Sequence, residues 1–148
     1  MWRVSLSFLA LLLVVISCGR NKEESSATIN DIDDLKTQQY AINGKAIYDN
    51  LCANCHQLDG KGLGRLIPPL AGSDYMNEDV ARTVQIIKYG QSGEIVVNGV
   101  LYNQPMPPNP RLTSMEIAEV ATYIYNVWGN QRGLISPKEV EGYLAGNK

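Results

Sequence analysis

The sequence predicts an all-α domain of three main helices joined by long loops, with a short extra helix near the C-terminus. Three stretches repeat their apolar residues at helical spacing and have recognisable caps, whereas no stretch alternates as a strand does and no internal repeat is present. Two segments rich in glycine or proline, 59–74 and 91–111, separate the helices. Loops of that length in a small domain are usually functional or wrapped around something.

The first predicted helix covers residues 43–53 and places Ile47 and Leu51 on one face. The second is expected to begin after Asn77 and to end at Gly90. An asparagine can accept hydrogen bonds from the free amides at a helix start, and a glycine readily ends a helix. The apolar stripe of this helix consists of Val80, Val84 and Ile87.

The third helix is predicted by two signals at its start. Thr113 and Glu116 have the spacing of a capping box, and Leu112 and Ile117 have the spacing of a hydrophobic staple. The apolar stripe of this helix consists of Ile117, Val120, Ala121, Ile124 and Trp128. The final short helix is predicted by the Ser-Pro-Lys-Glu sequence of residues 136–139, which combines a serine cap, a proline at the first helical position and a glutamate three residues after the cap.

The N-terminus resembles the signal peptide of a bacterial lipoprotein. A positive charge at Arg3 is followed by an apolar run from Val4 to Ile16 and then by Cys18. We expect Cys18 to be lipidated and to anchor the chain to a membrane; an ordinary secretion signal with an incidental cysteine is the alternative. The residues after it are mostly polar and predict a flexible tether. The expected organisation is a signal peptide over 1–17, a lipidated N-terminus and tether over 18–37, a folded domain over 38–130 and a C-terminal extension over 131–148.

The segment CANCH, from Cys52 to His56, is the strongest chemical signal in the chain and matches the C-x-x-C-H pattern of covalent haem attachment. Each cysteine can add to one vinyl group of the porphyrin, and the adjacent histidine is then placed beneath the iron as an axial ligand. Three alternatives compete with this interpretation. A redox-active cysteine pair requires a βαβ context that the sequence lacks, a structural zinc site requires four ligands, and a plain disulfide between Cys52 and Cys55 is compatible with an oxidising compartment.

His56 is the only histidine in the sequence, so a second histidine of this chain cannot bind the other side of the iron. The remaining possibilities are a methionine, a weaker ligand, water or an open position. Met115 falls opposite the apolar stripe of the third helix, and Met76 lies where core packing competes with ligation. Met106 lies between prolines in the sequence PMPP, which restrict the free loop and reduce the entropy lost on ligation. Met106 is therefore the strongest candidate.

Residues 38–130 resemble class I cytochrome c. That family has a glycine and an aromatic residue eight and four positions before the first cysteine of its haem motif, where this chain has Gly44 and Tyr48. Val120 and Tyr123 resemble the residues that these two meet on the C-terminal helix. The resemblance implies that the two helices cross at close range, and that the fold is the class I cytochrome c fold wrapped around one covalently bound haem c.

The same resemblance implies a set of binding residues. The sequence PPLAG, residues 68–72, is similar to the family loop whose proline carbonyl accepts a hydrogen bond from the axial histidine, and PMPP is similar to the loop that carries the methionine ligand. The cofactor-binding residues are then Cys52, Cys55, His56, Pro68, Leu70 and Met106, of which His56 and Met106 bind the metal. The candidate donors to the haem propionates are Tyr75, Tyr102 and Trp128, with core packing as the alternative for each.

Histidine and methionine ligation fills both axial positions, so the resemblance implies an electron-transfer protein without catalytic residues. We expect a monomeric, lipid-anchored carrier on the periplasmic side of a bacterial membrane, working in a respiratory chain between a quinol-oxidising complex and a terminal oxidase or reductase. One alternative is a haem subunit of a periplasmic dehydrogenase or of a copper nitrite reductase. The other is a sensor or peroxidase in which Met106 dissociates from the iron.

The charge balance bears on the partners. With 13 basic and 15 acidic residues, the chain has a formal net charge of −2 and lacks the basic excess of a nucleic-acid-binding protein. A basic rim around the haem edge could still guide a redox partner, although an ordinary solvated surface is the alternative for each residue. The candidates for this rim are Lys61, Arg65, Lys88 and Arg111.

Overall fold

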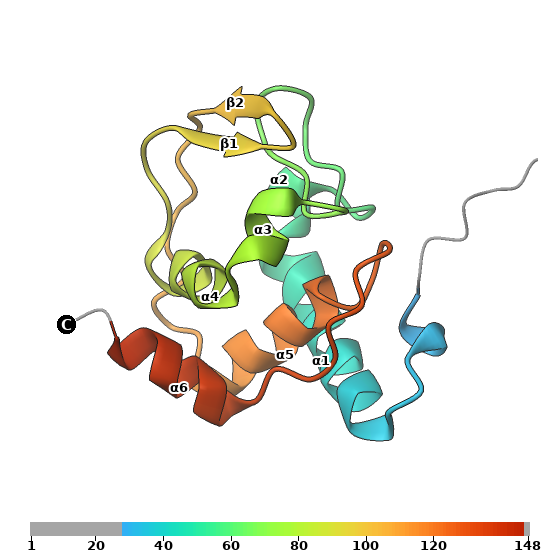
Figure 1. Cartoon of the computed structure of the whole chain (residues 1–148). Coiled ribbons are helices and arrows are strands. Elements are labelled where there is room, and N and C mark those ends of the chain that lie inside the picture. The colour runs from blue at the N-terminus through green and yellow to red at the C-terminus, as the bar shows by residue number, and fades with distance from the viewer. Residues whose placement is uncertain (1–27, 147–148) are drawn as a thin grey trace, which may run out of the picture.

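The computed structural model describes residues 28–146, in which helices and long loops surround a single core (Figure 1). The elements in chain order are η2 (Ile29–Asp31), α1 (Leu35–Leu51), α2 (Ala53–His56), α3 (Asp74–Glu78), α4 (Val80–Tyr89), β1 (Ile95–Val97), β2 (Val100–Tyr102), α5 (Ser114–Ile124) and α6 (Pro137–Ala145). The predicted signal peptide over 1–17, Cys18 and residues 19–27 of the predicted tether lie outside the described residues. Between residues 28 and 146, no helix is both long and apolar enough to cross a membrane.

The core is built on the crossing of α1 and α5, which form the most extensive contact between any two elements of the described chain. Gly44 and Tyr48 of α1 are buried in this crossing, and the rings of Tyr48 and Tyr123 lie 5.3 Å apart. Every residue of α5 from Ile117 to Ile124 except Glu119 is buried. The predicted close crossing of these two helices is therefore present, and it fixes where α1 ends and the CANCH segment begins.

The structured region begins earlier in the chain than the sequence predicts. Helix α1 begins at Leu35, where Asp34 caps it by accepting a hydrogen bond from the amide of Thr37 at 2.8 Å. Ile29 and Ile32 pack against the core. The predicted tether is therefore wrong over residues 29–37, because this stretch contains η2, the Asp34 cap and the first turn of α1, and its two isoleucines pack against the core.

The second predicted helix is two helices, α3 and α4, each with its own cap. The Ser73 hydroxyl accepts a hydrogen bond from the amide of Met76, and the Asp79 carboxylate accepts one from the amide of Arg82. Asn77 lies inside α3 and donates to the Asn130 side chain instead, so its predicted role as a cap is wrong. The break permits α3 and α4 to run in different directions (Figure 1).

A short hairpin is the one β element that the described part of the chain contains, and the sequence interpretation did not predict it. Strands β1 and β2 pair antiparallel through a turn at Asn98 and Gly99, both of which have positive φ. The turn is tied to α3, because Asp74 and Asn98 each donate a backbone amide to the other's side chain, at 3.0 and 2.7 Å. Strands of three residues are too short to show alternation, although Asn-Gly between apolar residues is typical of hairpin turns. The all-α class stands with this addition.

The C-terminal part follows the predicted caps closely. Thr113 and Glu116 form a capping box at α5, and Ser136 caps α6 in the same way. Helix α6 lies against α4 and α5, and its Val140 is fully buried, so the extension forms part of the core. Helix α5 ends at Ile124, which places Trp128 beyond the helix rather than on its stripe.

Candidate functional site

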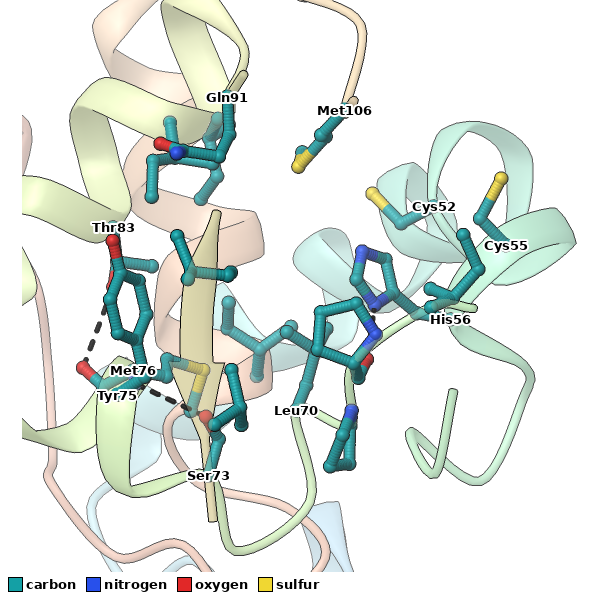
Figure 2. A pocket seen from close by; sticks show the side chains of 18 of the residues that line it. Cys52, Cys55, His56, Leu70, Ser73, Tyr75, Met76, Thr83, Gln91 and Met106 are labelled. Atoms are coloured by element: carbon teal, nitrogen blue, oxygen red, sulfur yellow. Dashed lines mark hydrogen bonds between the residues drawn. The ribbon is translucent and has the colours of Figure 1, made fainter. Parts of the chain in front are cut away.

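A deep, mostly apolar cavity lies between α2, α3, α4, α5, the hairpin and the two long loops (Figure 2). Including the part open to solvent, the space between the lining atoms measures about 970 Å³. Its mostly apolar lining is typical of a site for an organic cofactor. The six sequence-predicted binding residues, which come from three separate segments of the chain, all line this one cavity. They are Cys52, Cys55, His56, Pro68, Leu70 and Met106.

Both cysteines lie on the wall formed by the end of α1 and by α2. Cys52 is the last residue before the single turn of α2, and Cys55 lies within that turn. Burial, together with the neighbouring Cys55, raises the pKa of the Cys52 thiol to about 11, so this thiol is protonated at neutral pH. Neither cysteine is in a disulfide, and no group of three or more His, Cys, Asp or Glu side chains that could hold a metal gathers within residues 28–146. The described part of the chain thus contains neither the disulfide nor a ready zinc cluster.

His56 is held in a defined orientation by the loop that follows it. Its Nδ1 donates a hydrogen bond to the Pro68 carbonyl at 3.1 Å, because a carbonyl oxygen can only accept. The lone pair of the neutral ring is therefore on the other nitrogen, Nε2, which Figure 2 shows projecting into the cavity. Burial lowers the pKa of His56 more than the hydrogen bond to Pro68 raises it, which favours the neutral ring that can bind a metal.

Met106 projects into the same cavity from another wall (Figure 2). A backbone bridge fixes it: Met106 N donates to the Gln91 carbonyl at 2.9 Å, and Gln91 N donates to the Met106 carbonyl at 3.0 Å. The other two methionines of the described chain have different settings. Met76 is buried in the hydrophobic core at the inner wall of the cavity, whereas Met115 is 46% exposed on α5.

A family model described as Cytochrome c matches residues 41–128. The chain belongs to the cytochrome c family. It is 35% identical to cytochrome c-552 of Thermus thermophilus over 104 residues, which cover 68% of this chain and 74% of that protein. It is 29% identical to the fructose dehydrogenase cytochrome subunit of Gluconobacter japonicus, over 88% of this chain but only 28% of that protein. It is 31% identical to the Cbb3-type cytochrome c oxidase subunit CcoP of Rhodobacter capsulatus, over 62% of this chain and 30% of that protein.

Membership in this family confirms the predicted fold, the cofactor and the general activity. The cytochrome is an electron-transfer protein with one covalently bound haem c. The residues of the cavity fit that group. Two thiols at one wall, a neutral imidazole and a thioether are groups that can hold haem c, and apolar side chains line most of the remaining surface.

The structure separates the three aromatic candidates for propionate binding. Tyr75 lines the cavity. Tyr102 is buried, and its hydroxyl donates to the Gly64 carbonyl at 3.4 Å. Trp128 packs against the rings of Tyr48 and Tyr123, outside the cavity lining. Core packing therefore accounts for Trp128. Tyr75 lies at the cavity, so it stays a candidate donor to a haem propionate.

Three of the four residues predicted to form a basic rim are exposed. Lys61, Arg65 and Arg111 are exposed. Lys88 is half-buried, and its ammonium donates hydrogen bonds to two backbone carbonyls, so its assignment to a free rim is wrong. The sequence interpretation also missed Gln91, whose backbone holds Met106. The only signal for Gln91 is its position directly after the glycine that ends α4.

Proposed function

We propose that Cys52 and Cys55 form the two thioether bonds to haem c, and that His56 and Met106 are its axial ligands. Each thiol would add its S–H across one vinyl group of the porphyrin, with one C–S bond and one C–H bond formed and no net oxidation. The single observation that supports this most strongly is the convergence of the only histidine and Met106 on one apolar cavity that both cysteines line.

In this proposal each remaining residue has a defined task. When bound, haem c supplies a centre that takes up and releases one electron. Pro68 orients the imidazole through the hydrogen bond at Nδ1, and Leu70 forms part of the apolar wall. The thioether of Met106 and the apolar lining both disfavour the additional positive charge of the ferric state, so they raise the potential. Filling both axial positions keeps oxygen and small molecules from the iron, which opposes the sensor and peroxidase alternatives.

We further propose that the cytochrome is a monomeric, lipid-anchored carrier on the periplasmic side of a bacterial membrane. Its electron donor in this proposal is a quinol-oxidising complex of the respiratory chain, and its acceptor is a terminal oxidase or reductase. The lipoprotein-like pattern that ends at Cys18 supports the anchor. The second candidate is a haem subunit of a periplasmic dehydrogenase, which the similarity to the fructose dehydrogenase cytochrome subunit supports. Stable copurification with such an enzyme would favour the second candidate over the free carrier.

The ligand assignment is tested on the purified protein. The ferric form is expected to show the weak absorption band at the red end of the spectrum that arises from a bond between sulfur and iron. The ferrous form is expected to bind carbon monoxide only slowly at neutral pH, and the haem should stay attached to the denatured chain. Rapid carbon monoxide binding to the native protein would contradict a closed iron and favour the sensor alternative.

The anchor is tested by replacing Cys18 with serine in the full chain. Cys18→Ser removes the thiol that would carry the lipid, so the protein is expected to move from the membrane fraction into the soluble fraction, with its visible spectrum unchanged. The single change affects no described residue, so haem attachment serves as the internal control. If the serine variant remained in the membrane fraction after a high-salt wash, Cys18 would not be the anchor.

A further inference from the structure

The loop that carries Met106 has few hydrogen bonds of its own. Four of the seven residues from 104 to 110 are prolines, which have no amide hydrogen to donate. Near the methionine, the only backbone pairing within the described chain is the bridge between Met106 and Gln91. The position of the Met106 sulfur therefore depends on groups that lie outside the loop.

Lys88 supplies one of these groups, an ammonium that makes two hydrogen bonds at the end of the loop. It lies in the last turn of α4, and its Nζ donates to the carbonyl oxygens of Pro110 at 2.8 Å and Leu112 at 2.7 Å. These two carbonyls flank Arg111, just before the cap of α5. A lysine ammonium has three donors, and charge-assisted hydrogen bonds are stronger than neutral ones. One side chain thus closes the far end of the methionine loop.

The last turn of α4 is a firm support for this loop. Ile87 is buried in the core, and its carbonyl accepts a further hydrogen bond from the Asn109 side chain at 3.1 Å. Gly90, which ends the helix, permits the close approach of the loop. A Cβ on Gly90, whose φ is +82°, would lie 2.6 Å from the Met106 carbonyl oxygen. The loop is therefore attached at Met106 to Gln91, just beyond the end of α4, and at Asn109 and Pro110 to the last turn of α4 itself.

We propose that Lys88 is a positioning residue that keeps the sulfur of Met106 at the haem without touching either group. Its two hydrogen bonds restrict the loop before ligation, so less conformational entropy is lost when the sulfur binds. This inference rests on the proposed function, because it requires Met106 to be the axial ligand. It also explains why a lysine that the sequence pattern assigns to a partner-docking rim is half-buried against backbone carbonyls.

The test compares haem-loaded Lys88→Met with the wild type. Methionine keeps an apolar stem and removes the ammonium, so the loop loses two charge-assisted hydrogen bonds. The variant is expected to bind imidazole at the ferric iron about tenfold more tightly. It should also lose the red-end band at a lower urea concentration than the wild type, while the helical circular dichroism at that concentration is unchanged. A residue that only stabilised the global fold would shift the band and the helical signal together.

Two matched variants complete the test. Lys88→Arg retains the charge and the donors and is expected to restore most of the imidazole resistance. Lys138→Met removes the same charge from an exposed lysine on α6 and should behave as the wild type. If Lys88→Met is not recovered with haem, Lys88→Gln replaces it, because this shorter, uncharged side chain cannot reach both carbonyls.

Contrary results can be assigned to one proposal or the other. Wild-type imidazole affinity in the Lys88 variants, or the same increase in Lys138→Met, would overturn the role of Lys88. A wild-type protein without the red-end band would instead overturn the ligation by Met106. A wild-type band that persists in Met106→Ala would have the same meaning. The failure of the inference is thereby distinguishable from the failure of the proposed function.

Discussion

Replacing Met106 by alanine is expected to remove the red-end absorption band of the ferric protein and to open the iron to added ligands. Alanine has no sulfur, so the potential should fall by on the order of 0.1 V or more, within the roughly 0.8 V range over which axial ligands set haem potentials. The ferrous variant should bind carbon monoxide rapidly. An absorption spectrum, a redox titration and a carbon monoxide binding measurement together check this expectation.

Met115→Ala is the matched control for this change. Met115 lies on the exposed surface of α5, outside the cavity, so its replacement should leave the band and the potential as in the wild type. Because Met106 contributes little to the core, Met106→Ala should retain its haem and its helical content. An unchanged spectrum and potential in Met106→Ala would show that another group binds the iron. Met76, at the inner wall of the cavity, would then be the next residue to replace.

Replacing Gly44 by alanine is expected to destabilise the fold by about 3 kcal/mol or more, at the upper end of the cost of overpacking a core. A Cβ at this position would lie 2.0 Å from the Glu119 carbonyl oxygen and 2.9 Å from the Tyr123 Cβ. The oxygen belongs to the backbone of α5 and cannot rotate away, so α1 and α5 must separate. Since α1 leads directly into the CANCH segment, the yield of haem-loaded protein should fall too. Urea unfolding followed by circular dichroism measures the loss.

Gly142→Ala is the control for the change from glycine to alanine. Gly142 lies within α6 and is exposed, and apart from its chain neighbours and the nearby backbone of α6, no described atom lies within 4 Å of the position that a Cβ would take. Alanine should therefore stabilise α6 by roughly 0.5–1 kcal/mol, the usual difference between the two residues in a helix. If Gly44→Ala showed the same small gain, the close contact between the two helices would not limit the size of residue 44.

Local signals predicted much of this fold because the physical cause of each lies within a few residues. The capping boxes at Thr113 and Ser136 and the end of α4 at Gly90 need no distant contact to operate. Local signals also led to the wrong cap at Asn77, because they contain no information on distant contacts. Both Asn77 and Asp79 can cap a helix. In the structure Asp79 caps α4, and the Asn77 side chain instead contacts Asn130, a residue far along the chain.

The haem motif and the two candidate ligands could be found from the sequence alone, since they depend on residue types and spacing that few other functions require. CANCH is contiguous, His56 is the only histidine, and the prolines on either side of Met106 are adjacent to it. Those features determined the class of cofactor and made Met106 the strongest of the open choices for the second ligand. They did not determine what holds the ligand loop in place.

Only the tertiary structure decided how the site is assembled. Lys88 has the sequence setting of a surface lysine, and its contacts with Pro110 and Leu112 follow from the way α4 and the loop fold together. The tie between Asp74 and Asn98 likewise joins α3 to the hairpin across a long stretch of chain. Such contacts leave no local pattern, because a hydrogen bond depends on distance and direction in space rather than on separation along the chain. The sequence by itself therefore determined which chemistry this protein carries, and the packing of α1, α4 and α5 decided where its groups are held.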